Sequence, residues 1–331
     1  MQEIFDNTAL TQICEKLANP VTINEVEDIE AHTKAIWKTP VENGLNPTEQ
    51  QRFVEYFSKV GFVAKYKSYG TKYATPFGYS LFDLKNNAGF SIQLHEEEKI
   101  EAFHILSTQL QSFLLLGSID DWDENKEEFL ALWEEGTPER SSLVYRPEPG
   151  DIALVENLNT VHTVIGCILE EYATSSYDVV TRLHDQNKGD NVFLPEKHIP
   201  IADVLSRVQS FEPKRLIRKS LNGWDEQNIS ADEVLVDLPD GGLLGMHKTI
   251  GNHPINLEVP EDSITTIVAL HGETLVEIDG FKQLIVVGGT TAIPPGAKYK
   301  LKNASIYDQS RVSICQVRAQ TAFADLRTVA V

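Results

Sequence analysis

The sequence predicts a mainly β protein of two β-barrel (jelly-roll) domains, with a helical N-terminal segment and helical insertions. From residue 61 onward, short runs rich in Tyr, Phe and Val alternate with Gly, Asn and Pro, which is typical of successive β-strands joined by turns. A second series of such runs fills residues 231–331. Two barrels joined by a linker account for both series.

The first 60 residues are predicted to form a helical cap. Phe53, Phe57 and Val60 recur at spacings of four and three residues, which places them on one face of a helix. This face can pack against the first barrel, and we expect no chemistry from it.

The predicted boundaries follow these changes of pattern. A helical cap is predicted over residues 1–60, followed by the first barrel over residues 61–198 with a helical insert at 125–136. A helical linker is predicted over residues 199–230 and the second barrel over residues 231–331. In the second barrel the strands are predicted at Ser263–Leu270, Thr274–Ile278, Gln283–Val287 and Val312–Val317.

Metal-ligand side chains gather in the first barrel. Residues 90–95 alternate between apolar and polar, so Gln93 and His95 face the same side of a strand. Glu101 opens the next strand, and a later strand and turn lead to His162. Two imidazoles, a carboxylate and an amide oxygen form a donor set that suits zinc, iron(II), manganese or nickel. We therefore predict that these four side chains bind one divalent metal. The alternative is a barrel that has kept the residues and lost the metal.

The later strand is predicted at Asp151–Val155, directly after a Pro149-Gly150 turn. A proline followed by a glycine favours a tight turn before a strand. The short segment 156–160 then leads to His162, so residues distant in sequence can converge on one face.

The order of these motifs resembles the class I mannose-6-phosphate isomerases, a zinc-dependent bicupin family. Ser91-Ile92-Gln93-Leu94-His95 resembles the Ser-x-Gln-x-His strand of that family, and Lys99-Ile100-Glu101 resembles its Lys-x-Glu. Pro149-Gly150-Asp151 and Thr160-Val161-His162 follow in the same order. Glu171 to Ser176 and Thr181 to Asp185 are similar to two further motifs, so the resemblance runs from residue 90 to residue 188.

The resemblance implies an aldose to ketose isomerisation between mannose 6-phosphate and fructose 6-phosphate through a cis-enediol, with zinc as the metal. Arg182 is then expected in the substrate pocket, Lys188 against the sugar phosphate, and Ser91 as a hydroxyl donor beside the ligands. A guanidinium and an ammonium group suit phosphate and enediolate oxygens.

The base is expected to be an acidic residue, with Lys99 as the alternative. The resemblance points to Glu171, but one extra residue lies between Glu171 and Arg182 and can shift which acid faces the pocket, so Glu170 is a rival.

Two departures bear on these expectations. The loop before His162 is one residue longer than the usual form and lacks its proline and glycine. In the second barrel, Tyr299 follows a Pro295-Gly296 turn at the place where a metal histidine is expected, so this barrel is predicted to be metal-free.

Composition limits the partners. A net charge of -20 disfavours binding to nucleic acid. Cys14, Cys167 and Cys315 stand at no disulfide or metal spacing, which together with an N-terminus lacking a basic and apolar leader predicts a cytoplasmic protein. No apolar run reaches membrane-spanning length, so no membrane partner is expected. The resemblance implies a small-molecule substrate. The sequence does not indicate the oligomeric state.

Two other functions stay open at this point. One is a different metal-dependent cupin enzyme, an iron oxygenase or a lyase, acting on a small polar substrate. The other is a non-catalytic protein that binds a sugar or metabolite, which the altered loop before His162 favours.

Overall fold

The structure is a computed structural model that describes part of the chain in detail. The described residues are 62–66, 70–75, 77–84, 89, 92–95, 99–118, 127–128, 131–132, 142–155, 160–174, 181–184, 216–218, 232–238, 240, 242–278, 281–306 and 309–318. Their regular structure is almost entirely β, and only residues 127–128 and 131–132 are helical. The prediction of a mainly β protein is therefore confirmed.

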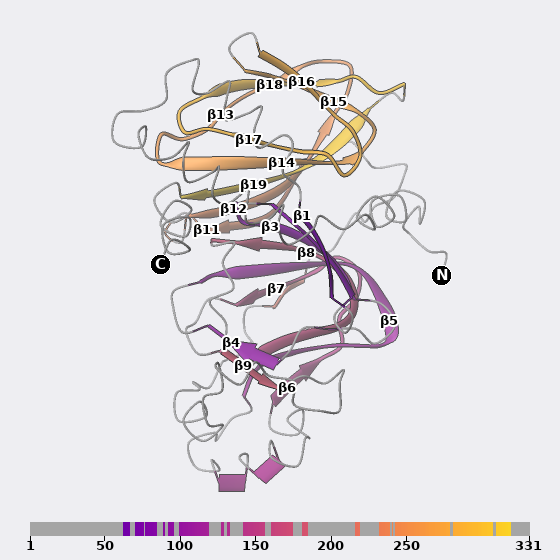
Figure 1. The fold of residues 1–331 in the computed structure, drawn as a ribbon, viewed down its shortest axis with the longest axis vertical. Coiled ribbons are helices and arrows are strands. Elements are labelled where there is room, and N and C mark those ends of the chain that lie inside the picture. The colour runs from indigo at the N-terminus through magenta and orange to yellow at the C-terminus, as the bar shows by residue number, and fades with distance from the viewer. Residues whose placement is uncertain are drawn as a thin grey trace.

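The first unit is built around one large antiparallel sheet, which Figure 1 shows in indigo and magenta. Its main path is β1-β2-β3-β8-β5-β7-β10, while β4 pairs with β8 and β9, and β6 pairs with β5. The strands are β1 (Phe62–Tyr66), β2 (Gly70–Ala74), β3 (Tyr79–Asp83), β4 (Ile92–Leu94), β5 (Glu101–Ser118), β6 (Ser142–Tyr145), β7 (Asp151–Val155), β8 (His162–Ala173), β9 (Thr181–His184) and β10 (Leu216–Arg218).

The second unit consists of two smaller sheets, drawn in orange and yellow at the top of Figure 1. One sheet has the order β11-β12-β19-β14-β17 and the other has the order β13-β18-β15-β16. The strands are β11 (Glu233–Leu238), β12 (Leu243–Ile250), β13 (Ile255–Glu258), β14 (Ser263–His271), β15 (Thr274–Ile278), β16 (Phe281–Ile285), β17 (Thr290–Ile293), β18 (Lys298–Asn303) and β19 (Ser310–Arg318).

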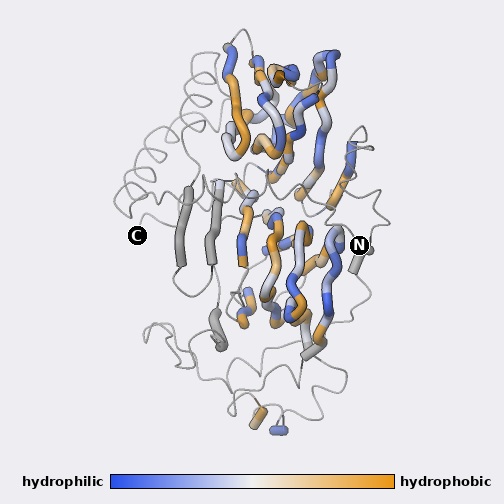
Figure 2. The backbone as a smooth tube through the Cα atoms, turned by 90° about the vertical axis from the view of Figure 1, so that its right-hand side faces the viewer, coloured by the Kyte–Doolittle hydropathy of each residue, from blue (hydrophilic) through white to orange (hydrophobic). Residues whose placement is uncertain are grey.

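The buried apolar residues form two clusters on opposite faces of the β3-β8-β5-β7 part of the first sheet. One cluster, which includes Phe82, Phe103 and Leu169, belongs to the first unit alone. The other joins the two units, because Tyr79 and Tyr172 of the first unit share it with core residues of the second. Apolar and polar segments alternate along the strands of both units (Figure 2). The two units are thus packed together through a shared apolar core.

Some predicted elements match the structure closely and others do not. Asp151–Val155 and Thr274–Ile278 are strands over the predicted residues. Within the predicted helical linker, Leu216–Arg218 instead forms strand β10, whose backbone pairs with β7. The predicted helical cap over residues 1–60 lies outside the described residues.

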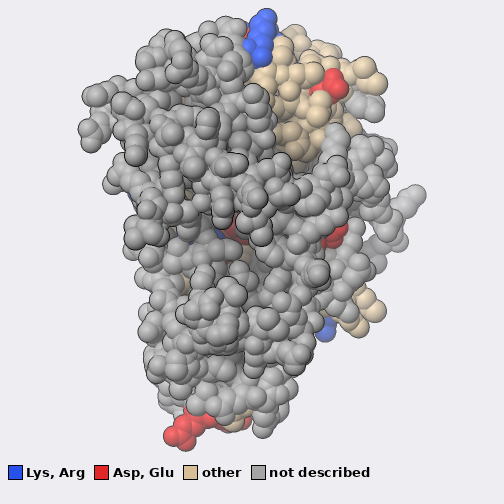
Figure 3. Space-filling model, in the orientation of Figure 1, with Lys and Arg blue, Asp and Glu red and all other residues tan. Residues whose placement is uncertain are grey.

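Two further observations concern the molecule as a whole. Among the described residues, no helix is long and apolar enough to cross a membrane. On the face drawn in Figure 3, the charged side chains of the described residues are scattered among uncharged ones.

Candidate metal centre

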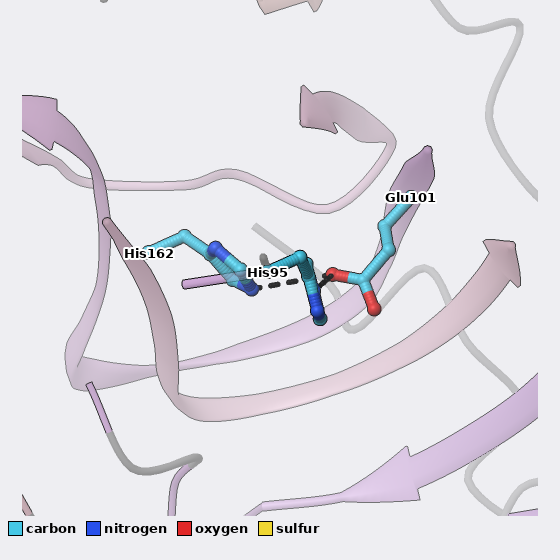
Figure 4. A group of neighbouring side chains, drawn as sticks. All are labelled: His95, Glu101 and His162. Carbon is cyan, nitrogen blue, oxygen red and sulfur yellow. Dashed lines mark ion pairs between the residues drawn. The ribbon is translucent and has the colours of Figure 1, made fainter. Parts of the chain in front are cut away.

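Three side chains of the first unit converge on one point (Figure 4). The Nε2 atom of His95 lies 3.0 Å from Oε2 of Glu101, and the Nε2 atom of His162 lies 3.2 Å from the same oxygen. All three side chains are almost completely buried. The site therefore holds two imidazoles and a carboxylate out of contact with bulk water.

Strand pairing and the bend of the sheet together bring residues distant in sequence to this point. Gln93 of β4 lies directly opposite His162 of β8, so these two side chains are neighbours, and His95 follows immediately after β4. Glu101 begins β5 and His162 begins β8, but these antiparallel strands pair so that the two residues lie at opposite ends of the ladder. The ladder contains two register shifts, and β5 bends strongly (Figure 1), which allows its two ends to approach each other.

The tautomer of His162 identifies a place for a cation. Its Nδ1 lies 2.9 Å from the carbonyl oxygen of Thr160 and donates to it, so Nε2 carries the lone pair. That lone pair faces Glu101 Oε2, which is also an acceptor and has no hydrogen-bond donor in suitable geometry among the described residues. Burial lowers the pKa of His162, which disfavours a proton between them. Two buried acceptors turned toward each other are the arrangement that a metal ion satisfies.

Lys99 keeps the carboxylate of the centre ionised. Its Nζ lies 2.6 Å from Oε1 of Glu101, the oxygen turned away from the imidazoles. Burial raises the pKa of Glu101, but attraction to Lys99 and then to His95 outweighs this effect and holds it well below the usual value. Glu101 therefore offers a charged oxygen to a cation.

Gln93 completes the donor set. Its amide nitrogen lies 3.2 Å from Nε2 of His162, where the N–H can donate to the lone pair. The two ends of an amide have nearly the same shape, so a half-turn places the Gln93 oxygen in the same position. In that orientation Gln93 offers the oxygen ligand that the sequence predicted for it.

The two candidate acids face opposite sides of β8. Glu171 lies opposite Phe103 of β5, and its Oε1 is 3.9 Å from Nζ of Lys99 beside the metal centre. Glu170 lies opposite His104 and points away from the centre, toward the second unit. Alternation along a strand requires this division. Of the two acids, only Glu171 is placed to serve the centre.

A second group of ligand-type side chains includes Glu170, and sequence reasoning did not predict it. His104, Glu170 and His247 are all buried within reach of one another. Oε2 of Glu170 is 2.9 Å from His104 Nδ1 and 2.7 Å from His247 Nε2, and Oε1 accepts a hydrogen bond from Tyr79 at 2.9 Å. Both carboxylate oxygens of Glu170 are thus in contact with groups that can donate hydrogen bonds to them.

Arg311 decides against a metal at this second group. A guanidinium N–H donates to Nδ1 of His247 at 2.9 Å, so the imidazole proton must sit on Nε2, facing Glu170. A metal ligand needs a lone pair at that position. At His162 a lone pair faces the carboxylate of Glu101, whereas at His247 a proton faces the carboxylate of Glu170, so the group of His95, Glu101 and His162 is the better candidate for a metal centre.

The remaining predicted site residues are placed only in part. The backbone of Arg182 in β9 lies opposite Gln93 of β4, which brings it two strands away from His162. Ser91 and Lys188 lie outside the described residues.

Several solved structures are similar to this chain. Mannose 6-phosphate isomerase from Bacillus subtilis is 14% identical over 72% of this chain and 74% of its own, with a TM-score of 0.44. The isomerase from Salmonella typhimurium, bound to fructose 6-phosphate and zinc, is 12% identical over 72% and 78%, with a TM-score of 0.45. A cupin 2 conserved barrel domain protein from Leptotrichia buccalis is 10% identical over 78% and 88%, with a TM-score of 0.36. No family model and no curated protein matches the sequence.

Proposed function

We propose that this protein is a metal-dependent aldose–ketose isomerase that acts on a small sugar phosphate of the mannose 6-phosphate and fructose 6-phosphate type. The observation that carries the proposal is the pair of buried acceptors, His162 Nε2 and Glu101 Oε2, that face each other at 3.2 Å beside His95. A cation between them would satisfy both acceptors once Gln93 turns its oxygen toward it, and the motif resemblance from residue 90 to residue 188 supplies the reaction class.

The donor set favours one divalent ion per chain. Two imidazoles, one carboxylate and the amide oxygen of Gln93 give four ligands without a thiolate, which suits zinc at a catalytic centre. When bound, the ion would supply a Lewis acid that polarises a substrate carbonyl. We propose zinc first, with iron, manganese and nickel as alternatives, and two cupin units as the architecture.

The residues beside the centre can perform the proton transfer. Glu171 is buried, faces the centre and lies near Lys99, so we propose that it carries a proton between neighbouring carbons of the sugar. Lys99 contacts both Glu101 and Glu171, and its ammonium group can stabilise negative charge on the enediol oxygens. We also propose Arg182 and Lys188 as phosphate ligands, with Ser91 as a hydroxyl donor.

The experiment is a coupled assay of mannose 6-phosphate isomerisation with zinc-loaded protein. Glu171→Gln should lower kcat about 100-fold to 10,000-fold, the usual range for loss of a general base, without loss of zinc. Glu261→Gln, the same change at an exposed site, should behave as the wild type. Zinc-loaded wild type without turnover of mannose 6-phosphate would refute the proposed activity.

One observation favours a second candidate. Two histidines and one glutamate also form the facial triad of non-haem iron(II) oxygenases. Protein that takes up iron in preference to zinc and consumes oxygen with a small polar substrate would support this function over isomerisation. A binding protein without catalysis would instead bind sugar phosphate and turn over none of it.

A further inference from the structure

The second unit holds β8 at two points, one on each side of Glu171. His247 of β12 contacts the carboxylate of Glu170, with 2.7 Å between Nε2 and Oε2. Ser313 of β19 contacts the hydroxyl of Tyr172, with 2.7 Å between the two oxygens. The residues immediately before and after Glu171 are therefore both hydrogen-bonded to a different unit of the protein.

These contacts leave Glu171 with one direction to face. Because side chains alternate along a strand, Glu170 and Tyr172 point to the second unit while Glu171 points to the opposite side. That side carries Lys99 and Glu101, at the metal centre. Anchoring both neighbours fixes the position and the tilt of the intervening residue.

At Glu170, the donor and the acceptor of each hydrogen bond to the second unit can be identified. Arg311 donates to His247 Nδ1, and His247 donates from Nε2 to Glu170, so a neutral imidazole bridges a buried cation and a buried anion. Glu170 also accepts from Tyr79 and contacts His104 within its own unit. In this chain of hydrogen bonds, from Arg311 through His247 to Glu170, each donor and acceptor role is determined. A buried network of such bonds holds β8 rigidly at Glu170.

Close packing reinforces these bonds. A Cβ added at Gly245 of β12 would lie 2.6 Å from the ring of Tyr172, so the backbone of the second unit passes directly over that ring. The Tyr172 ring also packs edge-on against Tyr79, with centroids 5.6 Å apart. β8 has little room to shift beneath the second unit.

We propose that His247 and Ser313 are positioning residues for the metal centre: the second unit, through these two side chains, orients Glu171 for proton transfer. The catalytic part of this inference rests on the proposed function of Glu171. The anchoring part rests on the contacts alone. The second unit is then part of the catalytic apparatus although none of its described residues belongs to the candidate metal-ligand group.

The test compares four full-length variants with the zinc-loaded wild type. His247→Leu removes one anchor and Ser313→Ala removes the other with little change in volume. His247→Gln is the conservative variant, because an amide can accept from Arg311 and donate to Glu170 in turn. Thr266→Val is the matched control, since it deletes a different buried hydrogen bond between the units, the 3.0 Å contact to the carbonyl oxygen of Phe77.

Two measurements are made on each variant: hydrogen exchange of the backbone amides in β8, and kcat and KM with mannose 6-phosphate. We expect faster exchange at residues 169–173 in His247→Leu and Ser313→Ala, and a fall in kcat on the order of 10-fold to 100-fold, as for a misplaced catalytic group. Zinc content and KM should not change, His247→Gln should recover most of kcat, and Thr266→Val should match the wild type. Ser313→Ala carries the test if His247→Leu does not fold.

The outcomes separate this inference from the proposed function. Unchanged exchange in β8 of a folded anchor variant would overturn the inference, as would faster exchange with an unchanged kcat. An inactive wild type would refute the isomerase, and faster exchange in both anchor variants would then still support anchoring of β8 by the second unit.

Discussion

Replacing Glu170 by glutamine should destabilise the protein strongly, because the carboxylate is the centre of the contact between the two units. Its oxygens face Tyr79, His104 and His247 at 2.9, 2.9 and 2.7 Å, and its own exposure is zero. Glutamine keeps one acceptor oxygen and turns an NH₂ group toward a donor. The substitution also removes the negative charge that balances Arg311.

The magnitude follows from these losses. A hydrogen bond to a charged group contributes about 1.5–3 kcal/mol. Removing one partner of a buried ion pair costs about 3–5 kcal/mol, because the other charge remains buried without compensation. We therefore expect Glu170→Gln to lower the free energy of unfolding by about 3–5 kcal/mol.

Urea unfolding at pH 7.5, followed by circular dichroism, measures this loss. The control is Glu258→Gln, the same substitution at an exposed residue whose ion pair with Lys298 spans 3.9 Å. Exposed ion pairs contribute at most about 1 kcal/mol, so this variant should unfold close to the wild type. If Glu170→Gln loses no more stability than Glu258→Gln, the buried cluster does not hold the units together.

Three further predictions concern other parts of the molecule. Burial lowers the pKa of His247, so near pH 6.5 the unfolded chain binds more protons than the folded protein. The free energy of unfolding should therefore fall below that pH, by about 1.4 kcal/mol per pH unit for this group. Urea midpoints measured from pH 7.5 to 5.5 should fall less steeply in His247→Gln than in the wild type, and equal slopes would contradict a buried, neutral His247. Gly78→Ala should lower the thermal midpoint, because Gly78 has a φ of 70° and an added Cβ would lie 2.4 Å from the carbonyl oxygen of Ala173; a midpoint unchanged from the wild type would show that this turn can adjust. Gln93→Ala should weaken zinc binding in a chelator competition without abolishing it, because His95, Glu101 and His162 remain, whereas an unchanged affinity would remove Gln93 from the ligand set.

The sequence was sufficient where the signal is local. The Pro149-Gly150 turn before it and the short turn after it predicted strand β7 over Asp151–Val155, and the structure has the strand over those residues. The spacing of His95, Glu101 and His162 on predicted strands led to one hypothesis for all three residues. In the structure, both imidazoles lie within hydrogen-bond distance of the Glu101 carboxylate.

The sequence was insufficient where contacts depend on how the units pack. Sequence reasoning could not connect His247 with Glu170 and His104, because these partners belong to the other unit and no periodicity relates them. The choice between Glu170 and Glu171 stayed open for a similar reason: alternation shows that they face opposite sides, but only the packed sheet shows which side holds the metal centre. The sequence analysis predicted a second barrel over residues 231–331 but did not predict its strands β11, β12, β13, β17 and β18 individually.

The metal content of the purified protein tests the central claim most directly. Elemental mass spectrometry should find about one divalent ion per chain in the wild type, as expected for a four-ligand centre. The ion should also be present in His253→Ala, which changes an exposed histidine. It should be lost in His162→Ala, which removes a ligand of the buried centre. Wild-type protein without metal after zinc loading, or His162→Ala protein that retains a full complement, would contradict the assignment of this centre.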